Sequence, residues 1–94
     1  MFVSSAIAPH PEVVDTELDK QETVLLHLGT KKYFSLNPTG SVIWRGLKKG
    51  LAPEAIAREL AGRYDVTAER AKQSVTALVD ALVEERLVLR GQDQ

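Results

Sequence analysis

Few side chains in this sequence have the chemistry of a catalytic or metal-binding group. The chain has no cysteine and only two histidines, which excludes disulfides, thiolate metal sites and thiol nucleophiles. A serine nucleophile needs a nearby base that a third group orients. His10 lies between two prolines, and the strand pattern makes His27 a half-exposed residue between Leu26 and Leu28. We therefore expect no enzymatic activity, no metal and no cofactor.

The sequence also gives little support for a phosphate-binding loop or for a catalytic pair of carboxylates. The glycines after the first third of the chain are single and scattered, unlike the glycine-rich loops that bind phosphate. Glu84 and Glu85 are adjacent, and adjacent positions on a helix do not face each other. We interpret the two carboxylates as a solvated helix end.

The charge balance does not favour a polyanion as partner. The 94 residues carry 12 basic and 13 acidic side chains, for a net charge of -1. The helix expected at residues 67–85 has two basic and four acidic side chains, a net charge of -2, which is the wrong sign for contact with phosphates. A basic region on the preceding hairpin and helix keeps a DNA-binding protein as an alternative; it comprises Lys31, Lys32, Arg45, Lys48 and Lys49.

Length and composition indicate one globular domain. The hydrophobic fraction is 44% and the charged fraction 27%, close to the average of globular proteins. No apolar run approaches the roughly 20 residues that cross a bilayer, and the first residues lack the cationic start of a secretory signal. We expect a cytoplasmic protein without nucleic acid or membrane as partner.

The first third of the chain predicts strands. Residues 1–12 carry two prolines and are expected to form a flexible lead-in that can contribute an edge strand. Residues 13–18, 23–28 and 32–36 have strand composition, with turn residues between them. Alternation puts Phe34 and Leu36 on one face of the last strand, and Tyr33 and Ser35 on the other. This pattern indicates a small antiparallel meander.

Helical periodicity then replaces the strand pattern. Asn37 and Pro38 are suited to a helix N-cap and first position, and this helix ends near Lys48. Pro53 opens a second helix, and Thr67 caps a third one that extends to residue 85. Residues 87–89 return to the sheet or core, and residues 90–94 are frayed. The fold class is α+β, winged helix-turn-helix-like, with a three-stranded antiparallel sheet followed by three helices, in a domain of residues 13–89.

This arrangement offers a place for a peptide strand. An edge strand presents unpaired N–H and C=O groups to which another strand can add. Beside the core stripe of the third helix, Val79 and Val83 extend the apolar surface toward Thr76 and Asp80. A groove between that flank and the third strand would hold apolar anchors of an extended peptide. In the alternative interpretation, Val79 and Val83 simply cover the sheet.

Residues 33–44, YFSLNPTGSVIW, contain a motif that resembles the aromatic-x-Leu-Asn-x-Thr-Gly-x-x-Ile-Trp signature of the PqqD-like family. The resemblance extends over roughly residues 13–88, through apolar residues that match the last two helices and the closing tail. Ser74 stands where many relatives have an acidic residue, and Arg86 stands where the last helix usually ends in glycine. These two departures concern the quinone-cofactor branch of the family and leave the fold unaffected.

The resemblance implies a function. Members of this family are peptide chaperones, or recognition elements of ribosomally made, post-translationally modified peptides (RiPPs). The family binds the leader segment of a precursor peptide as an added strand and delivers the peptide to a modifying enzyme. A free-standing domain resembles the leader-binding proteins of lasso peptide biosynthesis, which work with a leader peptidase and a cyclase. The alternative within the family is the chaperone of pyrroloquinoline quinone synthesis, which works with a radical SAM enzyme.

Carried over by position, the resemblance also implies the binding residues. The strand edge comprises Lys32, Tyr33, Phe34, Ser35 and Leu36. The helix wall comprises Val75, Thr76, Val79, Asp80 and Val83. The signature residues Asn37, Thr39, Gly40, Ile43 and Trp44 are interpreted as structural. Pairing between the exposed edges of two molecules predicts a monomer or a weak or swapped dimer in the absence of peptide.

Overall fold

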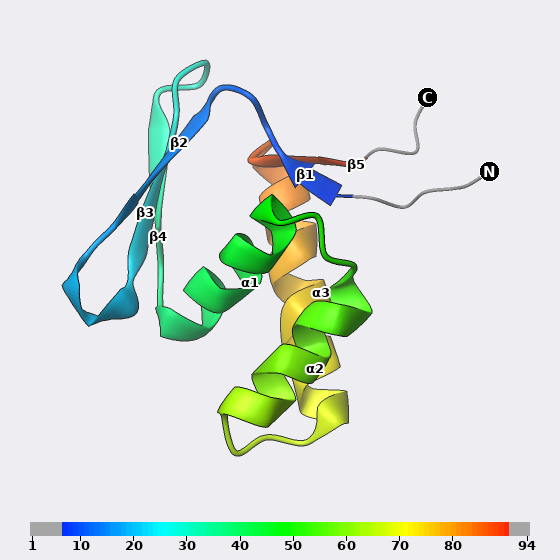
Figure 1. The fold of residues 1–94 in the computed structure, drawn as a ribbon. Coiled ribbons are helices and arrows are strands. Elements are labelled where there is room, and N and C mark those ends of the chain that lie inside the picture. The colour runs from blue at the N-terminus through cyan, green and yellow to red at the C-terminus, as the bar shows by residue number, and fades with distance from the viewer. Residues whose placement is uncertain (1–6, 91–94) are drawn as a thin grey trace.

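The computed structural model describes residues 7–90 and has an α+β fold. In chain order its elements are β1 (Ile7–Pro9), β2 (Val13–Glu17), the 3₁₀ turn η1 (Asp19–Gln21), β3 (Thr23–His27), β4 (Lys32–Leu36), α1 (Pro38–Lys48), α2 (Pro53–Arg63), α3 (Ala68–Glu84) and β5 (Val88–Arg90). The sheet of β2, β3 and β4 stands beside the helices, and β1 and β5 lie across one end of them (Figure 1). The predicted antiparallel sheet followed by three helices is confirmed.

The β2–β3–β4 sheet has one face against the helices and one face toward solvent. Leu25 is fully buried, and its cross-strand partner Phe34 is partly buried against the core. Leu36 on the same face of β4 is 7% exposed, whereas Tyr33 on the other face is 73% exposed. This alternation confirms the predicted faces of β4, because successive side chains of a strand point to opposite sides.

Helix α1 begins directly after β4. The side chain of Asn37 accepts a hydrogen bond of 2.7 Å from the backbone N–H of Gly40, and its backbone oxygen accepts one from Ser41. Pro38 occupies the first helical position, where its missing N–H costs nothing. Because Asn37 alone separates strand and helix, the end of β4 is fixed relative to the first turn of α1.

The core lies between the three helices and the inner face of the sheet. Its most deeply buried large side chains are Trp44, Leu25, Ile43, Leu47, Ile56, Leu60 and Leu87. Helices α1 and α2 approach closely at Gly46, where a Cβ atom would lie 2.7 Å from Cγ1 of Ile56. Any side chain larger than glycine at this crossing would therefore force the buried side chain of Ile56 to move.

The start of the chain takes part in the fold. β1 pairs antiparallel with β5 in the register Ile7↔Arg90 to Pro9↔Val88, and Ile7 is 6% exposed. Residues 7–9 are therefore packed into the domain: the strand that the lead-in was expected to contribute is present as β1, whereas the expectation of a loosely held segment is wrong for them. In the rest of that lead-in, the N–H of His10 donates a hydrogen bond of 2.9 Å to the backbone oxygen of Leu87, and residues 1–6 lie outside the described residues. Of the predicted frayed end, Arg90 belongs to β5, so the prediction is wrong for it, and residues 91–94 lie outside the described residues.

Polar contacts connect the sheet to α1. Oγ1 of Thr23 donates a hydrogen bond of 2.8 Å to Oγ of Ser41. Oδ2 of Asp15 accepts hydrogen bonds of 2.7 Å from Nε1 of Trp44 and 2.6 Å from Nζ of Lys48. Burial raises the pKa of Asp15, but the hydrogen bonds from Lys48 and Trp44 and the charge of Lys48 outweigh burial, so the pKa lies below its ordinary value of 3.8.

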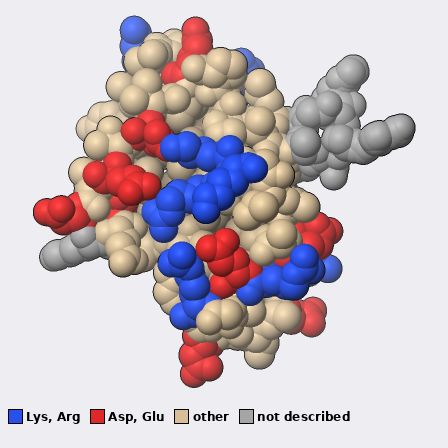
Figure 2. Space-filling model, in the orientation of Figure 1, with Lys and Arg blue, Asp and Glu red and all other residues tan. Residues whose placement is uncertain are grey.

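Basic and acidic side chains lie next to one another on the face that Figure 2 shows. Two of the basic residues singled out in the sequence are paired with carboxylates of β2: Arg45 with Glu17 at 3.5 Å and Lys48 with Asp15 at 2.6 Å. These pairs neutralise part of the basic region. Within residues 7–90, no helix has both the length and the apolar character needed to cross a bilayer.

Candidate functional site

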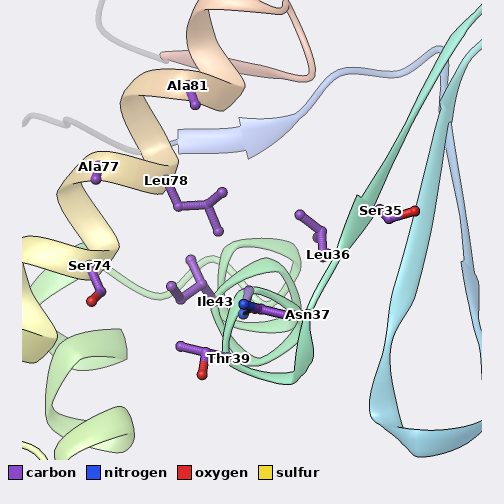
Figure 3. Close-up of a pocket in the computed structure, with 10 residues that line it drawn as sticks. Ser35, Leu36, Asn37, Thr39, Ile43, Ser74, Ala77, Leu78 and Ala81 are labelled. Atoms are coloured by element: carbon purple, nitrogen blue, oxygen red, sulfur yellow. Dashed lines mark hydrogen bonds between the residues drawn. The ribbon is translucent and has the colours of Figure 1, made fainter.

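A groove of about 470 Å³ separates β4 from α3. One wall is the end of β4, the floor is the start of α1, and the other wall is the middle of α3 (Figure 3). We call this the β4–α3 groove; its lining consists of Ser35, Leu36, Asn37, Thr39, Gly40, Ile43, Ser74, Ala77, Leu78 and Ala81. The side chains of Leu36, Ile43 and Leu78 point into it in Figure 3.

The groove is open because its α3 wall is made of small residues. Ser74, Ala77 and Ala81 recur at a spacing of three and four, which aligns them on one side of a helix. Their side chains are short, and the longer side chain of Leu78 points into the space between the two elements in Figure 3. The floor of the groove is held in place by core packing, since Ile43 is 1% exposed and belongs to the hydrophobic core.

The lining combines an apolar floor with hydroxyl groups at the rims. Leu36, Ile43 and Leu78 supply apolar surface, while Thr39 and Ser74 supply hydroxyls. The hydroxyl of Ser35 points away from the groove in Figure 3. Among residues 7–90, no charged side chain lines the groove. Such a surface suits an uncharged, partly apolar ligand, because apolar burial provides affinity and the hydroxyls accept or donate hydrogen bonds.

One wall of the groove is also an open sheet edge. In the part of the chain that the structure describes, β4 pairs only with β3, in the register Thr23↔Leu36 to His27↔Lys32. In an antiparallel pair, every second residue directs its N–H and C=O groups away from the partner strand. The outer edge of β4 therefore offers backbone hydrogen-bonding groups directly beside the groove.

The structure brings the predicted strand residues to this edge but divides the predicted helix residues. Ser35 and Leu36 line the groove, and Lys32, Tyr33 and Phe34 continue the same edge toward the hairpin tip. Val75 and Val79 are 1% and 4% exposed and belong to the core. These two valines are not among the residues that line the β4–α3 groove, so their part in peptide binding stays a prediction.

The remaining predicted residues of α3 lie away from the groove. Thr76 and Asp80 line a shallow polar hollow on the other flank of α3, together with Glu69, Lys72, Gln73 and Ala77. Val83 is partly buried against the core. The groove wall is thus on the opposite flank of the buried stripe. Sequence reasoning missed it because the small residues at 74, 77 and 81 carry no apolar signal, and only their spacing indicates a shared face.

The signature residues have structural roles and also contribute to the groove. Asn37 caps α1, and Ile43 and Trp44 are buried at 1% and 2% exposure. Asn37, Thr39, Gly40 and Ile43 nevertheless line the groove. The turn that joins β4 to α1 therefore forms the floor of the site.

The two histidines lie next to each other, with ring centroids 4.7 Å apart. His27 is 4% exposed, so the prediction of a half-exposed side chain is wrong. His10, Glu12 and His27 have potential ligand atoms within 4.8 Å of one another. Nδ1 of His27 accepts hydrogen bonds from the amides of Gly29 and Thr30, and Nδ1 of His10 accepts one from Glu12. Among the described residues, Nε2 of His27 is buried and has no hydrogen-bond partner.

Comparison with known proteins gives three findings. Residues 22–88 match the family model described as coenzyme PQQ synthesis protein D (PqqD). A structure described as TbiB1 in complex with the TbiA(beta) leader peptide is 32% identical in sequence, with a TM-score of 0.83, and the match covers 93% of this chain and 99% of that chain. A lasso peptide synthetase B1 complexed with the leader peptide is 30% identical, with a TM-score of 0.82, and covers 89% and 98%. No curated protein matches significantly.

Proposed function

Because the chain belongs to the PqqD family, we propose that it binds the leader segment of a ribosomally made precursor peptide and catalyses no reaction itself. The observation that carries this proposal is the open edge of β4 beside the uncharged β4–α3 groove. The two similar structures, each a complex with a leader peptide, support it independently. We call the bound segment the guest peptide.

The guest peptide binds by strand addition. It extends the sheet as a further strand on the outer edge of Lys32–Leu36, so that its backbone pairs with the outward N–H and C=O groups of β4. Side chains on one face of the guest strand point toward the helices and fill the groove against Leu78 and Ile43. Main-chain hydrogen bonds provide affinity, and the apolar groove selects for large apolar side chains at alternate positions.

The protein acts as a chaperone that delivers the guest peptide to other enzymes. The name of one similar structure, lasso peptide synthetase B1, favours lasso peptide biosynthesis, in which a leader peptidase and a cyclase receive the peptide. The description of the matching family favours a second candidate, the chaperone of pyrroloquinoline quinone synthesis with a radical SAM enzyme. Genes next to that of this chain distinguish the two, because each pathway requires its own enzymes.

The test uses the full chain and two probes, the TbiA(beta) leader peptide and the leader of the precursor encoded nearest to this gene. Titration followed by NMR should shift the amide signals of residues 32–36 and of 74–81. N-methylation of single peptide amides should weaken binding about tenfold at every second position, because each lost backbone hydrogen bond costs about 1 kcal/mol or slightly more.

The controls are the intervening peptide positions, where N-methylation should have little effect on affinity because those amides point away from β4. If N-methylation weakened binding at consecutive positions of the peptide, this result would contradict strand addition. Shifts confined to the hollow around Thr76 and Asp80 would contradict the groove. Absence of binding by both peptides would contradict leader recognition itself.

A further inference from the structure

The β4–α3 groove continues into a second hollow. This hollow, of about 140 Å³, lies between the start of α1, the end of α2 and the first turns of α3. It shares Thr39 and Ser74 with the groove, and both residues lie at the same end of the groove in Figure 3. An extended peptide that leaves the groove past Leu36 toward Thr39 and Ser74 can therefore continue into this hollow.

The chemistry of the hollow differs from that of the groove. Of the residues that the structure describes, Arg70 is the only charged one that lines the hollow, and no carboxylate lines it. Thr39, Tyr64 and Ser74 add hydroxyl groups, while Leu60 and Ala71 close the hollow with buried apolar surface. We call it the Arg70 hollow. A guanidinium with hydroxyl groups around it is the environment that a carboxylate requires.

The position of Arg70 is not explained by the stability of α3. Arg70 is in the first turn of the helix, where its backbone N–H is capped by Thr67. The helix dipole favours acidic rather than basic side chains there. Among residues 7–90, Arg70 forms no ion pair that would offset this cost. A local conflict of this kind is typical of a residue retained for binding.

We propose that the Arg70 hollow binds an acidic side chain, Asp or Glu, of the guest peptide. This inference rests on the proposed function, since it needs a guest strand along β4 to deliver that side chain. The groove then selects an apolar residue, and the adjoining hollow selects a carboxylate in the same guest peptide. Arg70 is the residue that determines this second requirement.

The test measures the affinity of paired peptides for the full chain. At each position of the two leader peptides named above, one peptide carries Glu and its partner carries Gln. For the unmodified protein we expect about tenfold tighter binding of the Glu peptide at one position, since a hydrogen-bonded carboxylate–arginine pair is worth more than a neutral contact. Arg70→Gln should reduce this ratio to about one, and Arg70→Glu should invert it. Lys72→Gln, a change on the other flank of α3, should leave the ratio unchanged.

Two results would overturn the inference while leaving leader binding intact. If the Glu and Gln peptides bind with about equal affinity at every position, then the hollow does not bind a carboxylate. If the Arg70→Gln variant still prefers the Glu peptide over the Gln peptide, then another residue binds the carboxylate. If neither peptide family binds the unmodified protein at all, the proposed function fails and this inference with it.

Discussion

Thr23 on β3 and Ser41 on α1 share a hydrogen bond of 2.8 Å at a point from which solvent is excluded. The two residues are 1% and 0% exposed. Each hydroxyl therefore depends on the other, because a buried polar group without a partner loses its hydration without compensation. This contact holds the strand next to β4 against the helices, and so contributes to the position of the groove wall.

We expect Thr23→Val and Ser41→Ala each to lower the free energy of unfolding by about 1–3 kcal/mol, since each leaves one buried hydroxyl unpaired. The double variant should be destabilised by less than the sum of the two, with a coupling of about 1 kcal/mol. Urea denaturation followed by the fluorescence of Trp44 measures all three. Additive effects would contradict an energetic link between the two hydroxyls.

The carboxylate of Asp15 makes stability depend on pH. Because its pKa is lowered in the folded state from an ordinary value of 3.8, ionised Asp15 stabilises the fold above that value. The contribution is lost as the pH falls through the lower, folded pKa. Asp15→Asn should therefore be less stable than the unmodified protein at about pH 7, and the difference should shrink below about pH 3. An equal difference at both pH values would contradict the role of the charge.

Two glycines should respond in opposite ways to alanine. Gly46→Ala puts a Cβ atom 2.7 Å from Cγ1 of the fully buried Ile56, and we expect destabilisation of about 1–3 kcal/mol from overpacking. Gly62→Ala is the control, because no atom lies within 4 Å of the added Cβ. It should stabilise α2 by up to about 1 kcal/mol through helix propensity. Thermal unfolding of both variants tests the close α1–α2 approach.

The flank of α3 that binds the guest peptide can be decided with one pair of variants. Ala81→Arg fills the β4–α3 groove, whereas Thr76→Arg adds the same side chain to the other flank. Both positions are exposed, so neither change should unfold the protein. We expect at least about tenfold weaker leader binding for Ala81→Arg and little change for Thr76→Arg, measured by calorimetry. The reverse order would restore the flank that periodicity alone suggested.

Local signals predicted the elements well. Asn37 and Pro38 at the start of α1, and Thr67 before α3, act through neighbours in the sequence, so their effect does not depend on the rest of the fold. The three meander strands likewise follow from composition and turns between them. These local signals were sufficient to predict the fold class and the edge strand of the candidate site.

Long-range packing decided what the sequence left open. Periodicity locates the buried stripe of α3 around Val75 and Val79, but the flank that meets β4 depends on how the sheet sits on α1. In β3, Leu25 and Leu26 are both apolar, so alternation could not distinguish the inner face; Leu26 is exposed and His27 is buried. The pairing of β1 with β5 joins segments at opposite ends of the chain, which no local pattern indicates.

The two sides of the groove are built under different constraints. Leu36 and Ile43, on the strand and in the floor, are buried and belong to the core, whereas Ser74, Ala77 and Ala81 on α3 are exposed. Substitutions in the former alter folding, while those in the latter change only the shape that a ligand meets. Binding preference can thus drift, or be redesigned, by exchanging a few residues of one helix surface on an unchanged scaffold.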